Sequence, residues 1–125
     1  MSENKACSCG TAPKLIFACS GSADVGEITD KAARKLMRDG KGKMFCLAGI
    51  GGRIDGMIKL TESASKILVL DGCPISCAKN CMEKAGFDNF EYLNLAEIGM
   101  QKGNTEANDK NISIATDEAS KKLSC

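Results

Sequence analysis

The chain has 125 residues, which is enough for one domain with a substantial core and too few for two independent ones. Its 17 Lys and Arg residues against 16 Asp and Glu give a net charge of +1, and with one Tyr, four Phe and no Trp we expect no nucleic-acid partner. The absence of His excludes Ser-His and Cys-His catalytic pairs, mixed cysteine-histidine zinc sites and histidine-ligated haem.

The N-terminal residues predict neither a secretion signal nor a membrane anchor. Charges of both signs precede the first cysteine, and the first apolar run covers only 15–19. No later apolar run approaches the roughly 18 residues of a membrane-spanning helix. We therefore expect a cytoplasmic protein without membrane association, whose eight cysteines stay reduced. Residues 1–13 have no periodicity and contain Gly10 and Pro13, so we expect a flexible tail.

Short apolar runs alternate with helical periods along the chain. Residues 15–19 predict a buried strand. A helix after it is indicated by apolar residues at helical spacing and by a glycine where a C-terminal cap belongs: Val25, Ile28, Ala32, Leu36 and Gly40. Residues 43–47 predict a second strand, 49–52 a flexible turn and 54–64 a second helix.

The same alternation continues through the second half of the chain. Residues 66–70 predict a third strand. Pro74 suits the first position of the next helix, with Cys73 as its N-cap and Gly86 at its end. Asp24 and Asp71 are expected to be cap residues, with orientation of a ligand as the alternative. Residues 90–95 predict a fourth strand, followed by a short helical turn. Beyond these, apolar residues are spaced for a C-terminal helix, although the polarity of this segment also fits disorder: Ile112, Ala115, Ala119 and Leu123.

This order of elements predicts the fold class. Alternating strands and helices favour an α/β fold, with a single domain of three layers, α/β/α, around a mostly parallel sheet of about four strands. We expect a tail over 1–13, the α/β domain over 14–104 and a helical C-terminal segment over 105–125.

Cysteines follow three of the predicted strands in equivalent positions. Cys19, Cys46 and Cys73 are separated by 27 residues each, and parallel strands bring such positions to one edge of the sheet. Cys77 lies four residues after Cys73 and can join them from the predicted helix. Four thiolates are the donor set of a structural zinc site, so these four are the predicted metal ligands. Separate buried thiols are the alternative, and Cys81, four residues further on, could belong to the core or replace one ligand.

The motifs around these cysteines resemble those of the DGC-domain family, named for a central Asp-Gly-Cys motif. The similar segments are Phe17-Ala18-Cys19-Ser20-Gly21 with Ala23-Asp24-Val25-Gly26, Cys46-Leu47-Ala48-Gly49-Ile50-Gly51-Gly52, Asp71-Gly72-Cys73 and Cys73-Pro74-Ile75-Ser76-Cys77. The resemblance covers about residues 14 to 101. It implies a zinc-binding protein of unassigned function whose chelating residues are Cys19, Cys46, Cys73 and Cys77.

Other chemistries use some of the same residues. An iron–sulfur cluster also takes four thiolates, but the CxxCxxC runs of many such proteins are absent. A phosphatase loop would need Arg at position 25, which is Val, and Arg53 lies one residue too far from Cys46. The glycines at 49–52 fail the GxGxxG dinucleotide motif because position 54 is Ile. A redox or sulfur-carrier role for Cys73 stays open, and with it the question of enzyme activity.

Three cysteines and one charged helix remain outside this site. Cys7, Cys9 and Cys125 are expected in mobile tails rather than in a second site. The charged residues between Arg34 and Lys41 are expected to form a solvated helix face. The sequence identifies no protein partner and no oligomeric state.

Overall fold

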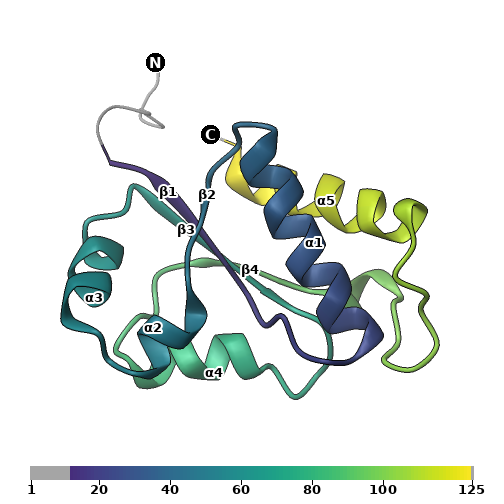
Figure 1. Cartoon of the computed structure of the whole chain (residues 1–125), viewed down its shortest axis with the longest axis horizontal. Helices are drawn as coiled ribbons and strands as arrows, with labels where there is room; N and C mark the ends of the chain where they lie inside the picture. Colours follow the sequence, from purple (N-terminus) through teal and green to yellow (C-terminus); the bar gives the residue numbers. More distant parts are fainter. Residues whose placement is uncertain (1–11, 125) are drawn as a thin grey trace.

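Four parallel strands form one sheet in the computed structural model, which describes residues 12–124 (Figure 1). They are β1 (Lys14–Ala18), β2 (Lys43–Met44), β3 (Lys66–Asp71) and β4 (Glu91–Asn94). Their order across the sheet is β2-β1-β3-β4, and every pairing is parallel. The predicted α/β class with about four parallel strands is confirmed.

Helices cover both faces of the sheet (Figure 1). One face carries α1 (Asp24–Arg38) and α5 (Asp109–Leu123), and the other carries α2 (Leu47–Gly51), α3 (Asp55–Glu62) and α4 (Cys77–Lys84). Side chains alternate along each strand, so Ile16 and Leu68 face α1 and α5, whereas Leu15 and Val69 face the other helices. Both sets are buried, which explains why β1 and β3 are apolar except at their ends, where Lys14, Lys66 and Asp71 lie.

The second strand is shorter than predicted. It ends at Met44, although the N–H of Phe45 still donates to the C=O of Ile16 at 2.8 Å. Cys46 is the N-cap of α2, so the prediction of a strand over 43–47 and of a flexible turn over 49–52 is wrong in this segment. The physical reason is packing: α2 is uncharged and small enough to lie against its neighbours, and a Cβ at Gly49 would overlap the sulfur of Met57.

The helix after β3 begins later than predicted. α4 starts at Cys77, so Cys73 is not its N-cap and Pro74 is not its first residue. The residue at the N-cap is Ser76, which has the left-handed conformation with φ 60° and ψ 46°. Residues 73–76 form a turn in which the N–H of Ser76 donates to the C=O of Cys73 at 3.1 Å. This left-handed residue stops the helix from extending back to Pro74.

The C-terminal segment is helical over most of its length rather than disordered. α5 buries Ala115, Ala119 and Leu123 in the same core as α1. The predicted helical turn after β4 is present as the 3₁₀ helix η1 (Leu95–Ile98). Within residues 12–124, no helix is long and apolar enough to cross a membrane. Residues 1–11, which make up most of the predicted tail, and Cys125 lie outside the described residues.

Candidate metal centre

The strand order brings the predicted ligands to one edge of the sheet. β1 lies between β2 and β3, and all three strands run in the same direction. Cys19 directly follows β1, Cys46 precedes α2, Cys73 follows β3 by two residues, and Cys77 is the first residue of α4. The backbone segments that carry the four cysteines are therefore three neighbouring strand-to-helix connections at the carboxyl edge of the sheet.

Cys19 is half-buried and tied to both neighbouring elements. Its N–H donates to the C=O of Leu70 at 3.0 Å, which continues the β1–β3 pairing beyond the strand. Its sulfur lies 3.3 Å from the hydroxyl oxygen of Thr29 in α1. Because the Thr29 hydroxyl donates its one hydrogen to the C=O of Gly26 at 2.8 Å, the Cys19 thiol is the donor in the sulfur contact. Metal ligation by Cys19 would require this S–H···O bond to break.

The other predicted ligands differ in exposure. Cys46 and Cys77 are exposed, whereas Cys73 is half-buried against the core beneath α1 and α5. Among residues 12–124, no three Cys, Asp or Glu side chains form a group with the spacing of a metal site. Four cysteine thiols are a donor set that fits zinc, but in this arrangement their side chains would have to rearrange to surround the ion.

Cys81 occupies a different environment from the four predicted ligands. It is half-buried between α4 and α2, with its sulfur 3.9 Å from the C=O of Leu47. Burial raises the pKa of the Cys81 thiol above its ordinary value, and the Arg53 guanidinium only partly opposes this effect. The Cys81 thiol therefore gives up its proton less readily than an exposed thiol, which disfavours it as a replacement ligand.

Asp71, at the end of β3, caps α4 from a distance. Its carboxylate is 1% exposed and accepts hydrogen bonds from the N–H groups of Ala78 at 2.8 Å and Lys79 at 2.9 Å. It also accepts the Tyr92 hydroxyl at 2.8 Å. A negative charge at a helix N-terminus is favourable, and here it fixes the first turn that carries Cys77.

The match to the DGC-domain family model covers residues 15–120, which is most of the chain and includes much of α5. The chain belongs to the DGC-domain family. It is also similar to the "Anaerobic and virulence modulator AnvM" of Pseudomonas aeruginosa, with 35% identity over 88 residues that cover 70% of this chain and 67% of that protein. No solved structure matches the chain.

Each residue of the Asp-Gly-Cys motif has a separate structural role in this DGC-domain protein. Asp71 caps α4, as described above. Gly72 is buried against the start of α1, where a Cβ would lie 2.8 Å from Cγ2 of Val25 and 2.9 Å from its backbone carbonyl carbon. Only glycine allows β3 and α1 to approach this closely. Cys73 then begins the turn that leads to Cys77.

Sequence reasoning missed two polar residues of β4 beside this motif. Tyr92 and Asn94 lie two positions apart on one strand, and Asn94 is paired in register with Asp71. The Tyr92 hydroxyl contacts Asp71, and the Asn94 amide contacts the Cys73 backbone. The only available signal was their spacing, because two polar side chains at alternate positions of a strand point to one face. The register of β4 against β3, which brings both residues to the motif, cannot be predicted from local sequence patterns.

Tyr92 gives this network a pH dependence. Burial is the largest cause that raises the pKa of Tyr92 from 10.0 to about 12. The folded state then keeps a proton that the unfolded state releases near pH 10, so the free energy of unfolding should fall as the pH rises from about 10 to about 12. Urea unfolding across this range should show a smaller fall for Tyr92→Phe than for wild type. An identical pH dependence in both proteins would contradict the assignment.

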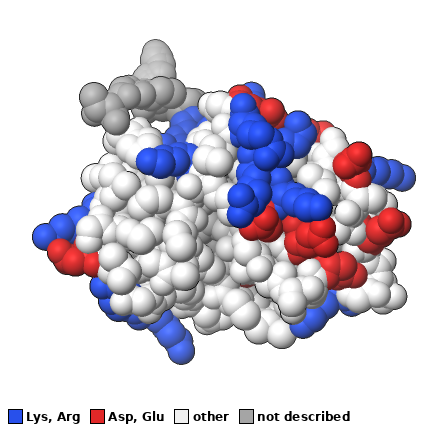
Figure 2. Space-filling view, in the orientation of Figure 1, with Lys and Arg blue, Asp and Glu red and all other residues white. Residues whose placement is uncertain are grey.

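The three segments that carry the predicted ligands contain no charged side chain. Residues 18–23, 44–52 and 72–78 contain no Asp, Glu, Lys or Arg. Figure 2 shows a broad uncharged area in the centre of the view, whereas Lys and Arg gather over α1. The Arg53 guanidinium, which a phosphatase-like loop would need, donates instead to the carbonyls of Ile50, Gly51 and Lys84. Its contacts therefore hold the ends of α2 and α4 together.

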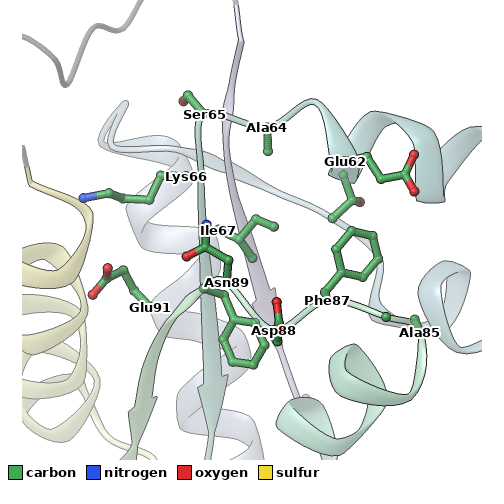
Figure 3. A pocket seen from close by; sticks show the side chains of 13 residues that line it. Glu62, Ala64, Ser65, Lys66, Ile67, Ala85, Phe87, Asp88, Asn89 and Glu91 are labelled. Atoms are coloured by element: carbon green, nitrogen blue, oxygen red, sulfur yellow. The ribbon is translucent and has the colours of Figure 1, made fainter.

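Two hollows lie away from the cysteines. A cavity of about 370 Å³ lies near the amino ends of β3 and β4, with Ile67 and Phe87 toward its middle and Glu62 and Glu91 on opposite sides (Figure 3). A groove of about 510 Å³ lies between α1 and α5, and four basic residues line it, of which Lys35 is half-buried and the other three are exposed: Lys31, Arg34, Lys35 and Arg38. Three of these four cations pair with carboxylates one turn away on α1 or at its C-terminal end, as expected of a solvated helix face.

Proposed function

We propose that this DGC-domain protein binds one zinc ion through Cys19, Cys46, Cys73 and Cys77 and uses it in a structural or regulatory role. The observation that carries the proposal is the position of these four thiols in three adjacent loops at one edge of a parallel sheet. Zinc bound by four thiolates would crosslink these loops. Four thiolates also leave no open coordination position for water, so the proposed role is not hydrolysis.

The contacts of the loops support a site that assembles when the metal binds. Cys46 and Cys77 are exposed and free to turn, while the backbone on either side is held by α2 and α4. Cys19 would give up its bond to Thr29 on binding. The two core clusters are complete without the metal, so zinc would add order to the edge rather than create the fold.

The proposal places the protein in the cytoplasm, where thiols stay reduced and can bind metal. The proposed regulatory role is supported by the similar protein of Pseudomonas aeruginosa, whose name describes an anaerobic and virulence modulator. The exposure of Cys46 and Cys77 also favours a second candidate, a thiol-based redox or sulfur-carrier protein, and the same donors suit an iron–sulfur cluster.

A zinc titration with matched cysteine variants tests the ligand set. Each of Cys19→Ser, Cys46→Ser, Cys73→Ser and Cys77→Ser should weaken zinc binding at least about 100-fold, because loss of even an outer partner of a metal ligand costs about 10- to 100-fold. Cys81→Ser is the control and should bind like wild type. The affinities are measured by competition with a colorimetric chelator under anaerobic, reducing conditions. The proposal would be contradicted if the wild-type protein did not bind zinc, or if Cys81→Ser lost as much zinc affinity as the four variants.

A further inference from the structure

The turn between β3 and α4 is held from outside by residues of β4. This turn carries two of the four proposed ligands, Cys73 and Cys77, and includes the left-handed Ser76. A non-glycine residue in this conformation costs about 1 kcal/mol or more, so the surrounding contacts must maintain it. The residues that supply them lie some twenty positions further along the chain.

Asn94 holds the backbone of the first ligand. Asn94 is buried, with 6% of its surface exposed, and its amide nitrogen donates to the C=O of Cys73 at 2.8 Å. The amide oxygen accepts the N–H of Ala96 at 3.0 Å in η1. This second bond fixes which end of the amide faces Cys73. The orientation of Asn94 is therefore set by an element outside the cysteine motifs.

Tyr92 joins Asn94 to the cap of α4. Its hydroxyl lies 2.8 Å from the carboxylate of Asp71, 3.1 Å from the amide nitrogen of Asn94 and 3.1 Å from the hydroxyl of Ser76. The phenol donates to the carboxylate and accepts from the Asn94 amide. One hydroxyl thus links both ends of the turn.

The geometry points to Tyr92 and Asn94 as positioning residues for the thiols of Cys73 and Cys77. The carbonyl of Cys73 and the first turn of α4 are the two anchors of the ligand-bearing segment, and the network holds both. Its role in metal binding rests on the proposed function, whereas its role in ordering the turn does not. The arrangement follows the rule that partners outside the ligand shell orient the ligands.

Amide hydrogen exchange of the metal-free protein tests the ordering of the turn. Tyr92→Phe keeps the ring that packs against Phe90 and removes only the hydroxyl. Exchange at residues 73–79 should accelerate about tenfold in this variant, because one or two hydrogen bonds of about 1 kcal/mol are lost. Asn94→Ala is the second variant, with the same expected result. Thr61→Val is the control, because it removes another buried hydroxyl, the one that donates to Met57 in α3.

Metal affinity tests the link to the thiols in the same proteins. Cobalt, whose thiolate complexes absorb visible light, should bind both variants about 10- to 100-fold more weakly than wild type and bind the control normally. Local acceleration of exchange together with weaker cobalt binding supports the positioning role. Unchanged exchange, acceleration spread over the whole chain, or unchanged affinity despite local acceleration would each overturn it. If the wild-type protein bound neither cobalt nor zinc, the proposed function would be refuted. The hydrogen-exchange result alone would then decide whether the network orders the turn.

Discussion

Asp71→Ala is expected to lower the free energy of unfolding by about 4 kcal/mol, because it removes an N-terminal cap and leaves buried donors without a partner. The carboxylate is 1% exposed and accepts two N–H groups of α4 together with the Tyr92 hydroxyl. No other described side chain accepts from these two N–H groups. Urea unfolding of the metal-free protein measures the change.

A surface carboxylate provides the control for this variant. Asp117 is exposed on α5, and Asp117→Ala should change the free energy of unfolding by no more than about 0.5 kcal/mol. The loss of unfolding free energy in Asp71→Asn should lie between those of Asp71→Ala and Asp117→Ala, because the amide oxygen can still accept one hydrogen bond while the charge is lost. A loss below about 1 kcal/mol in Asp71→Ala would show that the carboxylate does not hold α4.

Gly72→Ala is expected to lower the free energy of unfolding by about 3 kcal/mol, at the upper end of the cost of overpacking a core. The added Cβ would lie 2.9 Å from the backbone carbonyl carbon of Val25, which cannot move aside as a flexible side chain can. β3 and α1 would have to separate, and both belong to the central core. Thermal and urea unfolding of the metal-free variant measure the loss.

Gly56→Ala is the matched control for the glycine variant. Gly56 lies in α3, nothing is within 4 Å of the position of an added Cβ, and its backbone is helical. Alanine should therefore leave the protein as stable as wild type or stabilise it by up to about 1 kcal/mol. Equal stability of the two glycine variants would contradict the close approach at Gly72.

The regular parts of the fold could be predicted because burial imposes a period on the sequence. Val25, Ile28, Ala32 and Leu36 were expected on one face of a helix, and all four are buried on α1. Residues 15–18 of β1 and 67–70 of β3 are all apolar because helices cover both faces of the sheet. These signals are local, so they can be read without knowing the rest of the structure.

The parts that could not be predicted depend on contacts between distant residues. Cys73 was expected to be the N-cap of α4, whereas the helix begins four residues later. Asp71, which was expected to be a cap residue, accepts N–H groups seven and eight positions further along the chain, a distance that no local motif predicts. The short helix α2 is set by packing at Gly49 rather than by a helical period. The contribution of Tyr92 depends on the register of β4 against β3. Propensity and periodicity do not determine any of these three contacts, although the alternate spacing of Tyr92 and Asn94 does place both side chains on one face of the strand.

In the candidate site, the placement of the cysteines along the sheet edge could be predicted, whereas the contacts of their side chains could not. Strand order and direction place Cys19, Cys46 and Cys73 at one edge, and this could be inferred from alternating strands and helices alone. The side-chain positions could not, because the bond between Cys19 and Thr29 and the packing of Cys73 depend on α1. Zinc binding by the four cysteines stays a prediction.

Metal analysis tests this central claim most directly. The chain of residues 1–125 and its Cys73→Ser variant would be purified without oxygen and without added metal, then examined by elemental analysis and absorption spectroscopy. The account predicts about one zinc per chain, no visible absorption, and loss of the zinc in the variant. Iron with acid-labile sulfide and a brown colour, or a metal-free protein with reactive thiols, would contradict it.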